Sequence, residues 1–274
     1  KKKIGQPILG KISQIDLYKN GRLQLVFNTK NKIFVLDKNG KEVKPFPKSF
    51  NDDITQPISI FDYDKSKNYR ILVTQGKELL LYDKIGKKVN GFKYSKSNRE
   101  ITSSPKHFRI LNKDFIVFKT GKKLKILNRR GRERIKLNDD VVLSSENIFK
   151  LDNKLITVTN DQKLVEIDIS GSVSLTNLLN SKNLKLNTDN YNNIIVLDGN
   201  KMKLNSSYVD LPFSNYSTPK ITKINNNLFV SLFDSQNNKS YLFNKNLQVN
   251  SSFPIYSLIP TELGDMNNDK KTYV

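Results

Sequence analysis

The chain has 274 residues, enough for one large all-β domain or two smaller ones, and it contains no cysteine. The absence of thiols excludes disulfides, thiol catalysis and cysteine-based zinc centres. The formal net charge of +21 is unevenly placed, with 34 lysines and arginines against 12 acidic residues in 1–137 and 13 against 14 in 138–274. This asymmetry has two interpretations: a polyanion-binding face, or the compositional bias of a chain rich in Lys, Asn and Ile.

The sequence shows neither an apolar run that could span a membrane nor a signal peptide at its start. No run approaches the length of about 18 apolar residues that a membrane-spanning helix needs, so we predict no transmembrane segment. Residues 1–4 lead directly into "GQPILGKI" without the apolar stretch of a signal peptide. The sequence stops at "KTYV", inside a predicted strand, and we interpret it as a segment of a longer chain.

Predicted strands follow one another along the chain in groups of four. In the second group they are "SIFDY", "YRILVTQ", "ELLLYD" and "KKVNGF", and in the third they are "KHFRIL", "FIVFKT", "KLKILN" and "RERIKL". The first strands of successive groups begin near residues 8, 58, 106, 146, 184, 220 and 261. A proline precedes most of them, as in the "QPI" of 6–8 and 56–58, and no segment shows sustained helical periodicity.

A short polar turn recurs with the same spacing. Asp37-Lys38-Asn39-Gly40 returns at residues 83–86, 128–131 and 168–171, with offsets of 46, 45 and 40 residues. A weaker copy begins at Asn244, and Asn205-Ser206-Ser207 stands where an intermediate copy is expected. Asp or Asn at the first position and Gly at the last are typical of a hairpin turn that needs a positive φ.

These patterns predict an all-β fold, a β-propeller of four-stranded antiparallel blades. Four strands in each period of roughly 40 residues are typical of a propeller blade. Continuous apolar runs such as "IFVL" and "FIVF" indicate strands that are buried on both faces. We expect one propeller domain over residues 1–274 with seven blades, six complete and a partial seventh whose outer strand is Lys2 to Ile4. Pairing of the two ends would then remove the exposed sheet edges.

The repeats resemble bacterial β-propellers of the WD40, PQQ-like and FG-GAP type. The stretches "DYDKSKNYRILV" at 62–73 and "GDMNNDKKTYV" at 264–274 are similar to the first hairpins of FG-GAP units. The whole chain also resembles the C-terminal propeller regions of large uncharacterised envelope proteins of Gram-negative bacteria. This resemblance implies a location in the periplasm, the cell envelope or the extracellular space, which a cysteine-free chain fits.

Two acidic turns are candidates for calcium, and we predict no other cofactor. Asp265, Asn267 and Asp269 alternate along one turn, and Asp62 and Asp64 begin a similar ladder that continues through Ser66 and Asn68. Alternate residues in a tight loop direct oxygens toward one ion, and Ca²⁺ takes six to eight such ligands. The alternative is a polar hairpin without metal, which the neighbouring lysines and the missing loop glycine favour.

Nothing in the sequence indicates an enzyme. His107 is the only histidine, and strand geometry gives no reason for Ser103 or Ser104 to meet it as a nucleophile must. We interpret His107 as a half-exposed strand residue. The acidic residues lie singly or in pairs in turns, without the converging set that a two-metal nuclease needs, and no phosphate-binding glycine loop occurs.

A basic cluster lies in the third repeat. Its members share one predicted outer hairpin: Arg129, Arg130, Arg132, Arg134 and Lys136. Such a cluster at the rim of a propeller can contact phosphate or sulfate groups, or it can be an ordinary solvated rim. No aromatic platform or recognition helix accompanies it, so sequence-specific nucleic-acid recognition is not expected.

We therefore predict a non-enzymatic binding or scaffolding propeller of an exported or cell-envelope bacterial protein, with a protein or glycan partner. A second hypothesis is a polyanion-binding domain for nucleic acid, anionic glycan or lipid headgroups, which would use the basic cluster of the third repeat. A third, which we rank last, is an enzyme with its site at the mouth of the central channel.

Overall fold

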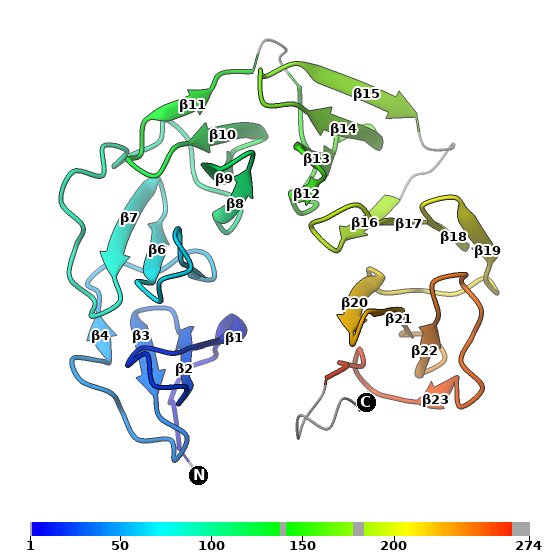
Figure 1. Ribbon diagram of the computed structural model, residues 1–274, viewed down its shortest axis with the longest axis horizontal. Helices are drawn as coiled ribbons and strands as arrows, with labels where there is room; N and C mark the ends of the chain where they lie inside the picture. Colours follow the sequence, from blue (N-terminus) through cyan, green and yellow to red (C-terminus); the bar gives the residue numbers. More distant parts are fainter. Residues whose placement is uncertain (1, 138–140, 178–183, 265–274) are drawn as a thin grey trace. The chain divides into compact units, whose positions relative to one another are not determined.

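The computed structural model describes residues 2–137, 141–177 and 184–264. Every regular element in this part of the chain is a β-strand, and the strands form six antiparallel sheets, five of four strands and one of three. Strands within a sheet follow one another in sequence order, so that each is joined to the next by a hairpin connection (Figure 1). The chain divides into an N-terminal unit, residues 1–140, and a C-terminal unit, residues 141–274, each with three sheets.

The N-terminal unit contains sheets 1 to 3. Their strands are β1 (Leu9–Ile15), β2 (Gln24–Asn28), β3 (Lys32–Leu36) and β4 (Lys48–Ser49) in sheet 1; β5 (Ser59–Phe61), β6 (Arg70–Gln75) and β7 (Glu78–Asp83) in sheet 2; and β8 (Lys106–Ile110), β9 (Lys113–Thr120), β10 (Lys123–Leu127) and β11 (Glu133–Ile135) in sheet 3.

The C-terminal unit contains sheets 4 to 6. Their strands are β12 (Phe149–Leu151), β13 (Lys154–Val158), β14 (Lys163–Ile167) and β15 (Val173–Asn177) in sheet 4; β16 (Leu184–Thr188), β17 (Ile194–Asp198), β18 (Lys201–Leu204) and β19 (Ser207–Asp210) in sheet 5; and β20 (Lys220–Ile224), β21 (Asn227–Asp234), β22 (Lys239–Phe243) and β23 (Ile255–Tyr256) in sheet 6.

The predicted four-strand repeat is confirmed, with one exception. The first strands β8, β16 and β20 begin at the predicted residues, β1 and β5 begin one residue later, and β12 begins three residues after the predicted position 146. The strand predicted at "KKVNGF" is wrong, because the chain beyond β7 pairs with that strand only through two isolated bridges, Tyr82 with Lys88 and Glu78 with Lys96. Gly91, at φ 84°, turns the chain away, and the amide of Lys93 then donates to the carbonyl of Arg130 in sheet 3.

The recurring D/N-x-x-G turn has the same geometry after the third strand of sheets 1, 2, 3, 4 and 6; we call it the third turn. In sheet 1 the Asp37 carboxylate accepts the amides of Asn39 and Lys41, at 2.9 and 2.8 Å, and Gly40 takes φ 78°. Asp83, Asn128, Asp168 and Asn244 accept the equivalent pair of amides in their own turns. In the last of these turns Leu247, at φ 58°, stands in place of glycine.

Sheet 5 departs from this pattern. Its third and fourth strands are joined by the two residues Asn205 and Ser206, since Leu204 pairs directly with Ser207. Asn205 stands at φ 51°, and its side-chain oxygen accepts the amide of Ile194 rather than amides of its own turn. The expected copy of the turn is therefore in the predicted place but is a shorter hairpin.

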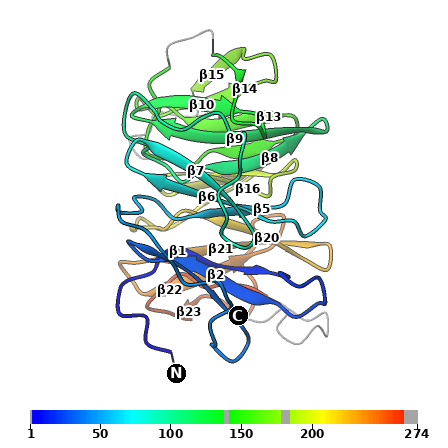
Figure 2. The same ribbon diagram turned by 90° about the vertical axis from the view of Figure 1, so that its left-hand side faces the viewer.

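The core lies between the faces of consecutive sheets. Sheets 1 and 2 enclose Val26, Val35, Ile71 and Val73, all at most 1% exposed. A second cluster fills the space between sheets 2 and 3, and two more separate sheets 4, 5 and 6. Figure 2 shows sheets 1 to 3 stacked upon one another. Middle strands are covered on both sides in this arrangement, which explains their continuous apolar runs.

The predicted outer strand at Lys2 to Ile4 is not a strand among the described residues. Ile4 packs instead against a small cluster of Phe27, Phe34 and Leu36, and the Lys2 ammonium lies 2.7 Å from the Glu42 carboxylate. The rest of the predicted seventh blade falls mainly on residues 265–274, outside the described part of the chain.

Candidate functional site

The connections between the first and second strands, here called first turns, carry most of the unusual polar chemistry of the N-terminal unit. In sheet 1 the carboxylate of Asp16, 5% exposed, accepts the amides of Asn20 and Gly21, both at 3.0 Å. The same carboxylate receives the ammonium of Lys67 from the first turn of sheet 2 at 2.5 Å. That hydrogen bond lowers the pKa of Asp16 and ties two neighbouring first turns together.

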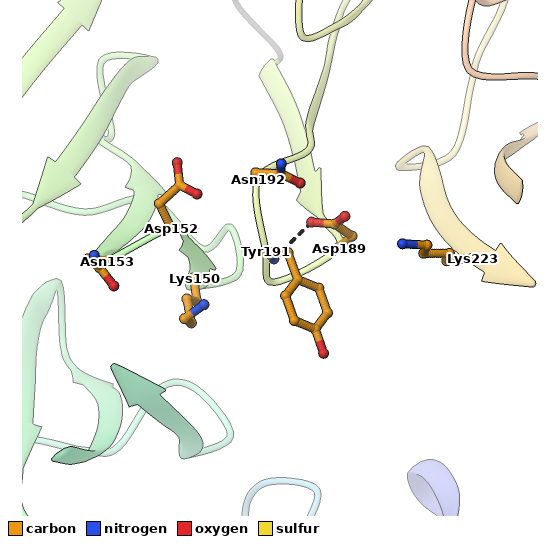
Figure 3. Close-up of a pocket in the computed structure, with 7 residues that line it drawn as sticks. All are labelled: Lys150, Asp152, Asn153, Asp189, Tyr191, Asn192 and Lys223. Atoms are coloured by element: carbon orange, nitrogen blue, oxygen red, sulfur yellow. Dashed lines mark hydrogen bonds between the residues drawn. The ribbon is translucent and has the colours of Figure 1, made fainter. Parts of the chain in front are cut away.

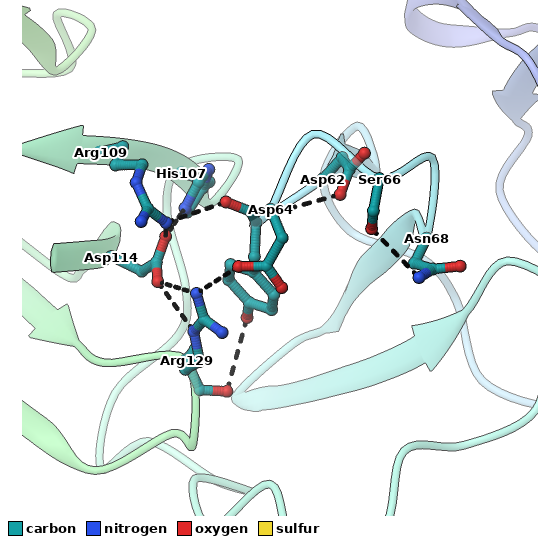
Figure 4. A network of polar contacts seen from close by, with 9 residues as sticks. Asp62, Asp64, Ser66, Asn68, His107, Arg109, Asp114 and Arg129 are labelled. Carbon is teal, nitrogen blue, oxygen red and sulfur yellow. Dashed lines mark hydrogen bonds and ion pairs between the residues drawn. The ribbon is translucent and has the colours of Figure 1, made fainter. Parts of the chain in front are cut away.

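A larger network surrounds Asp114, which is 4% exposed on β9 (Figure 4). Its Oδ1 receives Nε2 of His107 at 2.9 Å and Nη1 of Arg109 at 3.3 Å. Its Oδ2 accepts both Nε and Nη2 of Arg129, at 2.8 and 2.6 Å. Burial raises the pKa of Asp114, but the hydrogen bonds from His107 and Arg129 outweigh it and leave the pKa below its usual range.

Sheets 2 and 3 meet at this network. Arg129 comes from the third turn of sheet 3, and its Nη2 also lies 3.0 Å from the Asp64 carboxylate in the first turn of sheet 2. Its guanidinium stacks over the ring of Tyr63 at 4.8 Å, while Arg109 donates to the Tyr63 carbonyl at 2.9 Å. Burial, reinforced by the charge of Asp114, raises the pKa of the Tyr63 phenol, which therefore stays neutral.

His107 belongs to this network rather than to a catalytic triad. Its side chain is 10% exposed, less than the half exposure expected, and its ring stacks on Phe61 at 4.8 Å between centroids. Burial, with the charges of Arg109 and Arg129, lowers the pKa of His107 although Asp114 opposes this. A hydrolytic triad needs a nucleophile bonded to the imidazole. Within the described residues no hydroxyl bonds His107, and Ser103 instead accepts the amide of Lys119 at 2.8 Å.

The five predicted basic residues do not share one environment. Arg129 is held by Asp114 and Asp64, and the guanidinium of Arg134 lies over the ring of Phe115 at 5.0 Å. The remaining three, Arg130, Arg132 and Lys136, are exposed. Their side chains have no ion-pair partner in the part of the chain that the structure describes, so these three are free to contact a ligand.

The predicted calcium ligands are used differently or are not described. Asp265, Asn267 and Asp269 lie outside the described residues. The Asp62 carboxylate accepts the amides of Asp64 and Lys67 in its own turn, whereas the Asp64 carboxylate turns to Arg129. Over residues 2–137, 141–177 and 184–264, no group of three or more His, Cys, Asp or Glu side chains is placed to hold a metal ion.

The charge asymmetry coincides with the structural division. Residues 1–140 hold 34 lysines and arginines against 14 acidic residues, a formal charge of +20, and residues 141–274 hold 13 against 12, a formal charge of +1. The excess positive charge of the chain is therefore a property of the N-terminal unit.

One exposed apolar side chain stands in an unusual backbone conformation. The first turn of sheet 3 consists of Leu111 and Asn112, at φ 44° and 60°, between the paired residues Ile110 and Lys113. Two consecutive positive φ angles define a type I′ turn, which favours Asn and Gly. The equivalent turn of sheet 6 has Asn225 and Asn226 at φ 49° and 66°. Leu111 thus occupies a strained position, and it is 56% exposed.

Sequence reasoning missed both the Asp114 network and the turn at Leu111. One signal was available for the network: Arg109 and Asp114 flank a two-residue turn symmetrically, so an antiparallel hairpin pairs them directly. The participation of Arg129 had no such signal, because the residue is 15 positions from Asp114 and enters from another turn.

Comparison with known proteins identifies the fold. No protein-family model matches the chain, and no curated protein sequence is recognisably similar to it. Among solved structures, BBS1N crystallised in complex with ARL6DN superposes with a TM-score of 0.64 at 15% identity, over 92% of this chain and 84% of that one. The chain is a β-propeller. Virginiamycin B lyase from Staphylococcus aureus gives a TM-score of 0.60 at 16% identity, over 89% of this chain and 83% of that one.

A third similar structure is PorZ of Porphyromonas gingivalis, described as an essential bacterial surface component of the type-IX secretion system. It superposes with a TM-score of 0.53 at 15% identity, over 97% of this chain and 36% of that one. At such identities the likeness establishes the fold alone, and it confirms the predicted β-propeller. None of the described segments forms a helix with the length and apolar character required to cross a membrane.

Proposed function

We propose that this propeller is a non-enzymatic binding module of an exported or cell-envelope bacterial protein, and that the first turns of its N-terminal unit contact a protein partner. The observation that carries the proposal is Leu111. A left-handed conformation costs a residue with a Cβ roughly 1–2 kcal/mol, and an exposed leucine recovers little of this through burial. Strain of this kind is typical of functional positions, where a partner rather than the fold uses the side chain.

Exposed apolar side chains on a second first turn of the same unit also support a contact surface. The first turn of sheet 1 presents Tyr18, 59% exposed, and Leu23, 47% exposed. First turns lie at the same end of each sheet, because all sheets begin with the same strand order. Large exposed side chains among charged residues at one end of a unit are the usual composition of a protein contact region.

The hydrogen bonds of His107 and Asp114 argue against catalysis at the Asp114 network. The Asp114 carboxylate is paired with Arg129, and both of its oxygens already accept hydrogen bonds, from His107 and from Arg129. The lyase among the similar structures is a reminder that the fold also supports enzymes. BBS1N, by contrast, was crystallised with a protein partner, and PorZ is a bacterial surface component, which agrees with a binding role at the envelope.

Site-specific photo-crosslinking tests this proposal. A benzophenone amino acid is placed at Leu111 or Tyr18 in the bacterium that produces the protein, and the matched control places it at Ile169, 42% exposed in the third turn of sheet 4. We expect a discrete crosslinked species from positions 111 and 18 and none from 169. Equal crosslinking at all three positions, or none at any, would contradict a contact through the first turns.

A second candidate function is polyanion binding by the N-terminal unit. Its formal charge of +20 favours this candidate, together with the three exposed cations Arg130, Arg132 and Lys136 in and beside one third turn. Counterion release from a phosphate- or sulfate-bearing polymer would then supply the free energy of binding.

A further inference from the structure

A polar cleft of about 500 Å³ opens on the C-terminal unit (Figure 3). It is lined by residues of three consecutive sheets: Lys150 on β12, Asp152 and Asn153 in the first turn of sheet 4, Asp189, Tyr191 and Asn192 in the first turn of sheet 5, and Lys223 on β20. None of these residues drew attention in the sequence, because they are scattered over 74 positions. Only the pairing of first strands and first turns brings them together.

The base of the cleft is held by hydrogen bonds between sheets 4 and 5. The Thr188 hydroxyl donates to the carbonyl of Lys150 at 2.9 Å, and the Lys150 ammonium donates to the carbonyl of Asn190 at 2.8 Å. The amide of Asp152 donates to the carbonyl of Tyr191 at 2.5 Å. These bonds fix the two first turns against each other, so the cleft is pre-formed rather than assembled by a ligand.

The first turn of sheet 5 is also organised internally. The Asp189 carboxylate accepts the amides of Tyr191 and Asn193, at 2.8 and 3.1 Å, and Asn190 stands at φ 62°. This geometry directs the ring of Tyr191 outward, where the residue is 70% exposed. The Lys150 ammonium lies 5.6 Å from the centroid of that ring. Tyr191 is thus a positioned aromatic platform rather than a core residue.

Several polar groups of the lining are unused. Within the residues that the structure describes, the side chains of Asp152, Asn153 and Lys223 have no hydrogen-bond partner, and neither has the Tyr191 hydroxyl. Together they offer a carboxylate acceptor, amide donors and acceptors, and ammonium donors around one ring. Adjacent hydroxyl groups of a sugar match such alternating donors and acceptors, and the C–H face of a pyranose packs on the negative face of an aromatic ring.

The charges of the lining select among possible ligands. Two lysines face two aspartates, so the formal charge of the cleft is zero, in contrast to the +20 of the N-terminal unit. Lys150 and Lys223 disfavour a cation, and Asp152 and Asp189 disfavour a polyanion. A polar ligand without charge is repelled neither by the lysines nor by the aspartates.

We propose that this cleft binds a neutral saccharide, with one pyranose ring on Tyr191 and its hydroxyl groups on Asp152, Asn153 and Lys223. The site lies in the C-terminal unit and is independent of the protein contact proposed for Leu111. Each of the two ideas therefore stands or fails separately.

The test uses the full chain and three neutral probes, maltohexaose, chitohexaose and mannohexaose. A heparin hexasaccharide is the anionic comparator and zwitterionic tetraglycine is the peptide comparator. Saturation-transfer NMR detects binding and calorimetry measures affinity. We expect at least one neutral probe to bind, with an affinity that is insensitive to salt. Tyr191→Ala should weaken it about tenfold, whereas Tyr191→Phe, which keeps the ring, should retain it.

Tyr208→Ala is the matched control, because Tyr208 is 78% exposed on β19 of the same unit and outside this cleft. It should leave saccharide binding unchanged. The proposal is overturned if no neutral probe binds, if the heparin hexasaccharide or tetraglycine binds more tightly than the neutral probes, or if Tyr208→Ala weakens binding as much as Tyr191→Ala.

Discussion

Arg129 donates both Nε and Nη2 to a single carboxylate oxygen, Oδ2 of Asp114, at 2.8 and 2.6 Å. The two residues come from different hairpins of sheet 3, and Arg129 continues to Asp64 in sheet 2. One arginine thereby joins two sheets through a carboxylate that is 4% exposed. One of the five basic residues predicted to contact polyanions is therefore part of the framework of the N-terminal unit.

Removing the charge of Asp114 should destabilise that unit. Asp114→Asn leaves His107, Arg109 and Arg129 around a neutral amide, and losing one partner of a buried ion pair costs about 3 kcal/mol. Denaturant unfolding monitored by circular dichroism measures the change. Asp64→Asn is the control, because Asp64 is 61% exposed and its pair with Arg129 contributes about 1 kcal/mol or less. If the two substitutions lowered the free energy of unfolding equally, burial of Asp114 would not be what makes its ion pairs important for stability.

Acidification should destabilise the fold in two steps. The pKa of His107 lies below 6.5 in the folded chain, so the unfolded chain takes up the proton first and stability falls as the pH drops from about 7 to 5. Asp114, whose pKa lies below 3.8, adds a second loss at lower pH. Because His107 is the only histidine, His107→Gln should flatten the first step in a pH series of unfolding free energies. An unchanged slope between pH 7 and 5 would contradict the assignment.

Leu111→Asn should stabilise the protein although it removes an apolar side chain. Asparagine adopts the left-handed conformation more readily, and the gain is about 1 kcal/mol. Leu23→Asn provides the control, since Leu23 is similarly exposed but has no positive φ. A thermal melt that shows higher stability for the first variant only would support strain at Leu111. Crosslinking from position 111, measured separately, then tests whether a partner uses the side chain.

Gly131 should tolerate no larger residue. It stands at φ 72°, and a Cβ there would lie 2.8 Å from the backbone nitrogen of Tyr94 and 2.9 Å from the ring of Phe92. Gly131→Ala should therefore cost clearly more than the roughly 1–2 kcal/mol of a left-handed alanine. Gly21→Ala measures that conformational cost alone, because Gly21 has φ 79° and no atom within 4 Å. Similar unfolding free energies for the two variants would contradict the close approach.

Polyanion binding, if it is a function, should depend on the three free cations. Replacing Arg130, Arg132 and Lys136 with glutamine should reduce the dependence of heparin affinity on salt by about three counterions, while the fold stays intact. Arg129→Gln is unsuitable for this purpose because it also breaks the Asp114 network. An unchanged salt dependence in the triple variant would remove this hairpin from consideration, and duplex DNA and a neutral polysaccharide serve as comparison ligands.

The sequence pattern within each repeat was sufficient to predict the fold, because the strands and turns of a hairpin depend on residues close together in the chain. The turn at Asp37 and its copy at Asp83 form the same hydrogen bonds, since an Asx side chain and a glycine at φ near 75° act within five residues. The prediction failed at "KKVNGF", where the chain leaves β7 after the bridge at Lys88, donates from the amide of Lys93 to sheet 3, and meets β7 again at Lys96. Such a contact with a second sheet leaves no trace in a local pattern.

The candidate sites were less predictable for a related reason. The hairpin that carries the five basic residues was predicted correctly. Which of them are free to bind a ligand was not predictable, because Arg129 is held by Asp114 and Asp64 and Arg134 lies over Phe115. The cleft around Tyr191 could not be predicted, because its lining residues come from three different sheets and no sequence motif contains more than one of these segments.

The sequence by itself determined the all-β repeat, the places of the first strands and the turns between third and fourth strands, because these depend on interactions over a few residues. Only the tertiary structure decided which charges are neutralised at Asp114 and which polar groups surround Tyr191. Side chains far apart in the chain meet there because the sheets stack face to face, and burial then fixes the partners of each charge.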